Sequence, residues 1–199
     1  GYHIRRVSLY AGMLAEAHGC DEKFVEHVRR FAGLHDVGKV GLRDAILKKE
    51  GPLTDDEREE MKTHTLIGAE LLREAGLPEI ACNIALCHHE RWDGEGYPRG
   101  LSEEQIPIEA RIVAVADVYD ALTSDRPYRK GMAPDKAVDI LAEGAGTQWD
   151  PAVVEAFLAL LAEGRGLCPT TEALAARSPA APYAEQLPLP DRQRTRLNS

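Results

Sequence analysis

The sequence lacks the long apolar runs and the basic excess that mark several large classes of protein. No stretch of about 20 apolar residues occurs in its 199 residues, so no segment is expected to span a bilayer. The sequence has no basic segment followed by an apolar one, so it shows no secretory signal. The formal net charge of −9 argues against a protein that binds DNA irrespective of sequence. If the protein handles an anionic ligand, a metal ion is the usual means of attracting it.

Cysteine is also scarce, and its spacing excludes the commonest cysteine-based sites. The chain has four cysteines and no C-x-x-C pair, namely Cys20, Cys82, Cys87 and Cys168. A chain of this length does not need disulfides to be stable, so we interpret them as buried or incidental thiols in a reducing compartment. Zinc held by cysteine is therefore disfavoured. Because the thiols indicate a reducing compartment, the expected location is the cytoplasm.

Apolar residues recur at helical spacing through most of residues 1–164, and no convincing alternating strand pattern occurs. Asp21, Thr54 and Asp150 are expected to cap helices, and Pro151 suits a first helical position. The expected helices cover about residues 4–18, 22–35, 55–61, 66–74, 78–88, 108–123, 134–143 and 151–162. We therefore predict an all-α fold, a single-domain helical bundle.

The composition changes near Gly164. Residues 165–199 hold five arginines and three acidic residues, and five prolines stand among many alanines. This composition is typical of an irregular, poorly packed tail, so the expected domain covers residues 1–164. Because the chain starts at Gly1 and a helical pattern is already present at residue 4, we expect it to be part of a longer protein.

Histidine and aspartate form a set that suits divalent metals. His35-Asp36 and His88-His89 are adjacent pairs near expected helix ends, and His64 lies between two expected helices. Asp117 lies in an otherwise apolar helix, where a carboxylate costs several kcal/mol unless it is paired or bound to a cation. A structural salt bridge would also explain Asp117, and a lone histidine is usually a packing residue. Taken together, the residues indicate a two-metal cage inside a helical bundle.

The order of these residues resembles the HD superfamily of metal-dependent phosphohydrolases. The resemblance rests on the series His35-Asp36, Lys39, His64, His88-His89 and Asp117. The sequence HHERWDGEGYP at 88–98 is similar to the signature of the HD-GYP branch. The sequences DVYDALTSDRPYR at 117–129 and GTQWDP at 146–151 are also similar to that branch. The resemblance covers about residues 1–162.

The resemblance implies a helical bundle of the HD phosphodiesterase type and an activity. HD-GYP proteins are bacterial phosphodiesterases that linearise cyclic di-GMP to pGpG and in some cases cleave it to GMP. They are usually output domains behind a sensor or receiver domain, often act as dimers, and contact other proteins through the GYP loop. The expected partners are therefore a cyclic dinucleotide, an upstream regulatory domain, a GYP-loop partner and a second copy of the chain, with no DNA and no membrane in this segment.

The resemblance also implies a set of metal ligands. One ion would be held by His3, His35, Asp36 and Asp117. A second would be held by Asp36, His64, His88 and His89, with Asp36 bridging. Some members of the family hold a third ion with a glutamate four residues before the first histidine. That position would precede Gly1, so the sequence does not decide between two and three ions. The expected metal is iron or manganese.

The chemistry explains why such ligands are needed. Two cations about 3.5–4 Å apart clamp phosphate oxygens and share a water whose pKa falls toward neutrality. The resulting hydroxide, bridging the metals, would attack phosphorus, and no Ser or Cys arrangement suggests a protein nucleophile. Asp36 and Lys39 are the expected catalytic residues, because Lys39 lies about one helical turn past Asp36 and can reach the same phosphate.

Further residues are expected to contact the substrate. Arg126 and Arg129 match family positions that contact ligand phosphates, which suits the bidentate geometry of arginine. Gly96, Tyr97 and Pro98 of the GYP loop are also expected near the substrate; stacking of Tyr97 on a base is one option that we do not adopt as an expectation. A rigid loop that buttresses the histidine pair is an equally good interpretation.

Two alternative functions remain open at this point. The first is a signalling module that binds a cyclic dinucleotide or a protein partner with little turnover. The second is a hydrolase of cyclic GMP-AMP, because guanine and adenine differ only in the hydrogen bonds at their edges.

Overall fold

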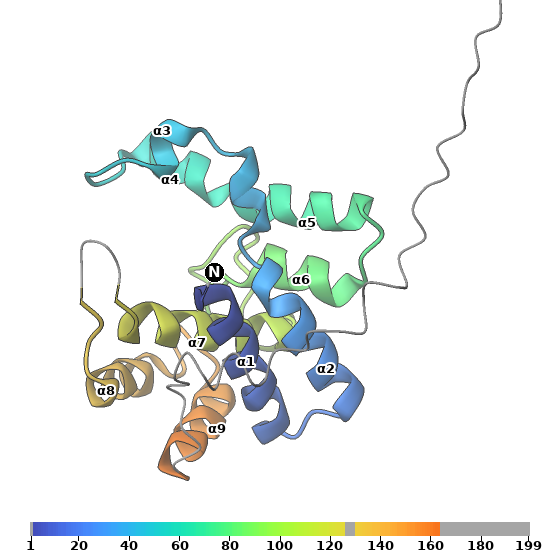
Figure 1. Ribbon diagram of the computed structural model, residues 1–199, viewed down its shortest axis with the longest axis vertical. Helices are drawn as coiled ribbons and strands as arrows, with labels where there is room; N and C mark the ends of the chain where they lie inside the picture. The colour runs from blue at the N-terminus through green and yellow to red at the C-terminus, as the bar shows by residue number, and fades with distance from the viewer. Residues whose placement is uncertain (1, 126–129, 164–199) are drawn as a thin grey trace, which may run out of the picture. The chain divides into compact units, whose positions relative to one another are not determined.

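The computed structural model describes residues 2–125 and 130–163, and this part of the chain consists of helices joined by turns and loops (Figure 1). The helices are α1 (Tyr2–Ala17), α2 (Glu22–Phe31), η1 (Ala32–Leu34), η2 (Val37–Gly41), α3 (Asp44–Leu47), α4 (Asp55–Lys62), α5 (His64–Glu74), α6 (Glu79–Cys87), η3 (Glu103–Gln105), α7 (Ile108–Thr123), α8 (Pro134–Gly144) and α9 (Pro151–Ala162). An isolated bridge between Ala145 and Trp149 is the one β-type pairing in the described ranges. The all-α prediction is confirmed. Among the described residues, no helix combines the length and apolarity that crossing a membrane requires.

The predicted helix caps are confirmed. The Asp21 carboxylate accepts from the Phe24 backbone N–H at 3.0 Å, at the start of α2. Thr54 forms a capping box at the start of α4. Asp150 accepts from the N–H of Ala152 at 2.8 Å, at the start of α9. These caps satisfy N–H groups that have no partner within their own helix, so each helix begins where the sequence indicates.

A large apolar core lies among α1, α2, α6, α7, α8 and α9. Helix α1 packs against α2, α7 and α9, and α7 also contacts α6 and α8. Inside this core, the Tyr119 ring makes edge-to-face contacts with Tyr10 and with Phe157, at centroid distances of 5.7 and 4.8 Å. The core holds α1 and α7 together, and each of these helices contributes side chains to the site described below.

A second packing unit joins η2, α5 and α6. A Cβ atom on Gly38, in η2, would lie 2.0 Å from the His64 carbonyl oxygen and 2.4 Å from the Gly68 nitrogen. Only glycine permits this approach of η2 to α5, because any side chain would collide with backbone atoms. The close approach places Asp36, just before η2, beside His64 at the first turn of α5.

Replacing Gly38 with alanine should therefore destabilise the protein, by at least about 2 kcal/mol of unfolding free energy. Gly51→Ala is the matched control, because a Cβ on Gly51 meets no atom within 4 Å. Urea unfolding followed by circular dichroism measures both variants. An equal, small change in the two variants would contradict the proposed role of the Gly38 contact.

One boundary differs from the prediction in a way that matters for the site. The sequence predicts one helix through His35, but α2 ends at Phe31 and the chain continues through η1 and η2. His35 and Asp36 lie between these two short helices. Successive residues of a regular α-helix point in different directions, so the interruption allows both side chains to face one point. The short helices α3 and η3 are also absent from the prediction.

Candidate metal centre

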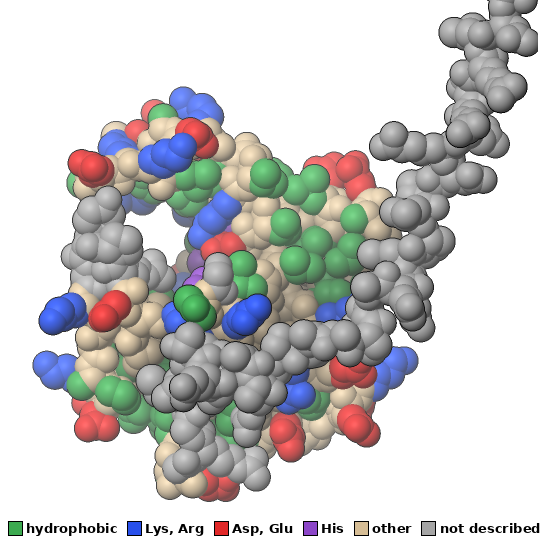
Figure 2. All heavy atoms as spheres, viewed as in Figure 1, with side chains coloured by type: hydrophobic (Ala, Val, Ile, Leu, Met, Phe, Trp, Pro, Cys, Tyr) green, Lys and Arg blue, Asp and Glu red, His purple; other side chains and the backbone are tan. Residues whose placement is uncertain are grey.

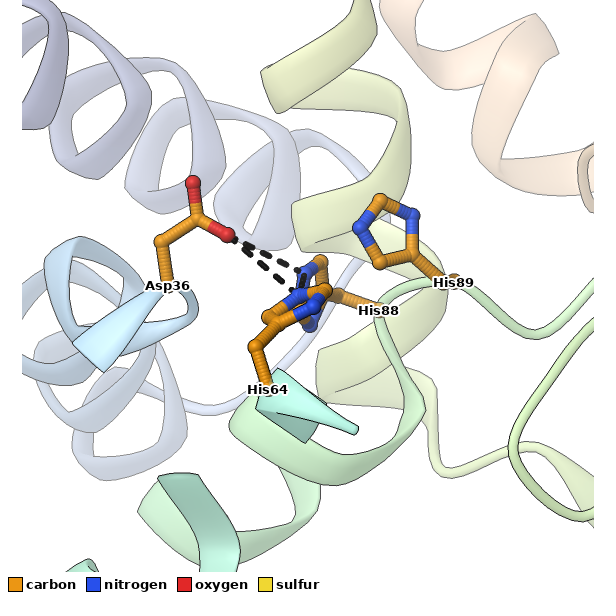
Figure 3. Close-up of side chains that lie close together, drawn as sticks. All are labelled: Asp36, His64, His88 and His89. Atoms are coloured by element: carbon orange, nitrogen blue, oxygen red, sulfur yellow. Dashed lines mark hydrogen bonds and ion pairs between the residues drawn. The ribbon is translucent and has the colours of Figure 1, made fainter. Parts of the chain in front are cut away.

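Three helices (α1, α5 and α7), the η1–η2 turn and the residues that follow α6 bring seven histidine and aspartate side chains together as two groups. The first group is Asp36, His64, His88 and His89, and the second is His3, His35 and Asp117; within each group the potential ligand atoms all lie within 4.8 Å of one another. Figure 3 shows the first group, with Asp36 on the η1–η2 turn facing the imidazoles of His64 and His88. In Figure 2 a small area of histidine surface is visible near the centre of the view. The predicted ligands are therefore all brought together, whereas His18 and His27 belong to neither group.

Asp36 connects the two groups through its two oxygen atoms. Its Oδ1 lies 3.4 Å from Nε2 of His64 and 3.8 Å from Nε2 of His88. Its Oδ2 lies 3.4 Å from Nε2 of His35. The Asp117 Oδ1 lies 3.6 Å from the same His35 nitrogen and 3.5 Å from Nε2 of His3. One carboxylate thus faces both groups, as expected for a bridging ligand.

Backbone carbonyls fix the tautomers of three imidazoles. Nδ1 of His35 donates to the Ala32 carbonyl at 2.8 Å, and Nδ1 of His64 donates to the Met61 carbonyl at 2.7 Å. Nδ1 of His88 faces the carbonyls of Ile84 and Ala85, each at 3.1 Å. Because a carbonyl can only accept, each of these rings in its neutral form carries its proton on Nδ1 and has a lone pair on Nε2. Such contacts orient metal-binding histidines.

The free atoms of the site converge without partners. Nε2 of His64 and Nε2 of His88 are 3.4 Å apart, and with both protons on Nδ1 their lone pairs face each other. Nε2 of His35 and Oδ1 of Asp36 are buried and have no hydrogen-bond partner among the described residues. Buried polar atoms are normally paired, and imidazole nitrogens with carboxylate oxygens are a donor set that divalent transition metals accept. The residues therefore fit metal ions.

The ionisation of the site favours metal binding as well. Burial lowers the pKa of His64, lowers that of His88 further, and lowers that of His89 to about 4. These rings are neutral at pH 7 and need not lose a proton to act as ligands. Burial opposes the charge of Asp36, but the neighbouring His35 and Lys39 side chains outweigh it and hold the pKa of Asp36 well below the usual range.

Lys39 lies beside the bridging carboxylate. Its Nζ donates to Oδ2 of Asp36 at 2.6 Å, across one turn of η2. The side chain of Lys39 is 40% exposed, so its ammonium is at the edge of the site rather than inside it. Lys39 therefore lies beside Asp36, and its contact with a phosphate stays a prediction.

Asp120, to which the sequence interpretation assigned no role, contacts His3. Its carboxylate is buried in α7 and accepts from Nδ1 of His3 at 2.7 Å and from Nε of Arg6 at 2.5 Å. This contact leaves Nε2 of His3 free to face Asp117. The sequence offered one signal for Asp120: it is a second carboxylate three residues after Asp117, and residues three apart lie on the same face of a helix.

Asp120→Asn should weaken binding at the group containing His3, because an amide stabilises the required proton on Nδ1 less well than a carboxylate does. Loss of such a supporting contact typically costs 10–100-fold in metal affinity. Titration of the metal-free variant with Mn²⁺, followed by electron paramagnetic resonance, measures the loss. Asp135→Asn, at an exposed site in α8, is the control, and equal affinities in the two variants would contradict the role of Asp120.

The segment after His89 folds back over the histidine pair. The Tyr97 ring stacks on the His89 imidazole, with centroids 4.8 Å apart and planes at 25°. A Cβ on Gly96 would lie 2.3 Å from the Arg91 nitrogen, which shows how closely the segment returns. Pro98 follows and is partly buried. Arg126 and Arg129 lie outside the described residues, as does the predicted tail.

Comparison with known proteins gives a consistent result. A family model described as an HD domain matches residues 2–153. A cyclic di-GMP phosphodiesterase of Thermotoga maritima is 48% identical over 160 residues, covering 79% of this chain and 44% of that protein. A 3'3'-cGAMP-specific phosphodiesterase 2 of Vibrio cholerae is 39% identical over 160 residues, covering 79% of this chain and 31% of that protein. The chain thus spans less than half the length of these relatives.

A solved structure supports the fold independently. The crystal structure of a cyclic GMP-AMP specific phosphodiesterase of Vibrio cholerae superposes with a TM-score of 0.71 at 20% identity, covering 87% of this chain and 47% of that one. At this level of identity the similarity concerns the fold.

Proposed function

Because the chain belongs to the HD domain family, in its HD-GYP branch, we propose that it is a metal-dependent phosphodiesterase that hydrolyses cyclic di-GMP to linear pGpG, with the end product, pGpG or GMP, left to the assay below. The single observation that carries the proposal is the placement of Asp36, whose two oxygens face two separate groups of ligand atoms. The name of the Thermotoga maritima relative supports cyclic di-GMP as the substrate.

The proposed ligand sets use every residue of the two groups. One ion would be held by His3, His35, Asp36 and Asp117, and the other by Asp36, His64, His88 and His89. Bound divalent ions would supply Lewis acidity toward the phosphodiester and a source of hydroxide at neutral pH.

The protein's own residues would prepare the site for this chemistry. Asp36 would fix the spacing of the two groups, and the carbonyl-bound Nδ1 atoms would keep each Nε2 available as a ligand. The Lys39 ammonium would bind the anionic phosphate from the edge of the site. We also propose phosphate contacts for Arg126 and Arg129, and a position near the substrate for Gly96 and Pro98.

The test is turnover of cyclic di-GMP by protein loaded with Mn²⁺ or Fe²⁺ under anaerobic conditions. We expect chromatography to show pGpG, and later replacement of pGpG by GMP would identify GMP as the end product. Turnover no greater than that of an Asp36→Ala variant with the same metal loading would overturn the proposal. Tight binding of the nucleotide by the metal-loaded protein, without cleavage, would instead support the signalling module.

Cyclic GMP-AMP is a second candidate substrate. The observation that favours it is the 39% identity to a relative named for that substrate. Parallel assays with each cyclic dinucleotide, and then competition between the two, distinguish the candidates through the ratio of their kcat/KM values. We expect kcat/KM for cyclic di-GMP to exceed kcat/KM for cyclic GMP-AMP, and the reverse order would assign the chain to cyclic GMP-AMP.

Several finer features are also proposals. We propose iron or manganese as the bound metal, two or three ions at the site, and residues 1–164 as the output domain. We also propose a regulatory domain upstream of it in a longer protein. We further propose dimeric assembly, a protein partner at the GYP loop and a cytoplasmic location. Elemental analysis of protein purified without chelators measures the identity and number of the ions.

A further inference from the structure

His89 differs from the other imidazoles of the site in what fixes its ring. Nδ1 of His35, His64 and His88 bonds to backbone carbonyls, and Nδ1 of His3 bonds to a carboxylate. Within the described part of the chain the His89 ring makes no hydrogen bond, and its contacts are with other rings. His89 also lies beyond the last residue of α6, where helical hydrogen bonds no longer hold the backbone.

Tyr97 provides the missing support. Its ring stacks face to face on the His89 imidazole, and its backbone N–H donates to the His89 carbonyl at 3.2 Å. The Tyr97 residue thus contacts both the ring and the backbone of His89. The Lys62 ammonium lies over the Tyr97 ring, 5.6 Å from its centroid. The Tyr97 ring therefore contacts both His89 and a cation.

Tyr97 is itself held in place by a buried carboxylate. Glu90 is 5% exposed and accepts from the backbone N–H groups of Arg99 at 2.7 Å and Leu101 at 3.0 Å. These two bonds anchor the end of the loop to the residue directly after His89. Gly96 adds close contact between the loop and the backbone of Glu90.

The start of the loop is anchored to a different segment. The backbone N–H groups of Trp92 and Asp93 donate to the carbonyls of Gln148 and Thr147, at 3.3 and 2.9 Å. These carbonyls belong to the GTQWDP sequence, whose Asp150 pairs with Arg111 of α7 at 2.6 Å. The loop that carries Tyr97 is therefore fixed at both ends, and a fixed loop can hold a ring against a metal ligand.

We propose that Tyr97 is a positioning residue that orients His89 for metal binding by ring stacking, and that Glu90 holds Tyr97 in place. The proposal rests on the proposed metal role of His89. It assigns the tyrosine of the GYP loop to the metal centre and not to stacking with a substrate base. The aromatic ring, and not the phenolic hydroxyl, is the part of Tyr97 that acts.

The test compares Tyr97→Leu with Tyr97→Phe. Metal-free protein is titrated with Mn²⁺, and free Mn²⁺ is measured by electron paramagnetic resonance. The leucine variant should bind Mn²⁺ about 10–100-fold more weakly than the parent, whereas the phenylalanine variant should retain the parent's affinity because it keeps the stack. His89→Ala marks the full loss of the ligand. Parent-like Mn²⁺ affinity in Tyr97→Leu, with a raised KM, would overturn the proposal in favour of a substrate contact.

A second variant covers the case in which Tyr97→Leu does not fold, as judged by circular dichroism of the metal-free protein. Glu90→Gln leaves one of the two loop N–H groups facing an amide that also donates. It should weaken Mn²⁺ binding in the same direction, and parent affinity in this variant would overturn the proposal. A parent protein that binds Mn²⁺ but cleaves no cyclic dinucleotide contradicts the proposed function alone, because the metal titrations still test Tyr97.

Discussion

Replacing Asp36 with asparagine should abolish cyclic di-GMP turnover, with a loss of more than about 10³-fold. Residues that only support a metal ligand already cost 10–100-fold when they are changed, and Asp36 faces both ligand groups directly. Asparagine has nearly the same shape but no negative charge, so it balances neither cations nor the adjacent Lys39 ammonium. Activity assays and elemental analysis of the same preparation should show both losses together.

Asp44→Asn is the matched control for this experiment. Asp44 also pairs with a lysine, at 2.6 Å, but the pair is exposed on α3, and such surface pairs contribute little. We expect parent-like turnover and metal content in this variant. If Asp36→Asn kept full metal content and turnover within tenfold of the parent, Asp36 would not be the bridging ligand.

The helices could be predicted from the sequence because their signals are local. The caps at Asp21, Thr54 and Asp150 and the apolar spacing each act within one or two turns, so their effect is visible in a short window. The interruption between Phe31 and Asp36 was not predicted. It depends on the close approach of Gly38 to α5, a contact between segments about 30 residues apart, and no local pattern reports such a contact.

The residues of the two groups could also be predicted, but the features that orient them could not. Histidine and aspartate are chemically distinctive, and the resemblance to the HD superfamily already implied the two groups. The carbonyls that fix the tautomers of His35 and His64 belong to Ala32 and Met61, and any residue type supplies a carbonyl. The role of Glu90 likewise depends on how the following loop folds back, which its own neighbours in sequence do not specify.

Removing the metal with a chelator should abolish turnover and leave the protein folded. The large apolar core is formed by side chains of α1, α2 and α6–α9 and includes none of the proposed ligands. The metal-free chain therefore keeps its principal source of stability, unlike small zinc domains that unfold without their ion. Far-ultraviolet circular dichroism at 25 °C should be unchanged, and turnover should return when Mn²⁺ or Fe²⁺ is added.

The same treatment should lower the thermal midpoint by roughly 10 °C. A ligand at about 1,000 times its Kd stabilises the folded state by about 4 kcal/mol, and each kcal/mol moves the midpoint of a domain of this size by roughly 2–4 °C. The physical origin is local, because metal ions would bind the buried Asp36 Oδ1 and His35 Nε2 atoms, which have no hydrogen-bond partner in the described part of the chain. Calorimetry of metal-free and reloaded protein measures the shift. Equal midpoints would mean that these atoms do not bind the metal, and complete loss of helical signal would mean that the core depends on it.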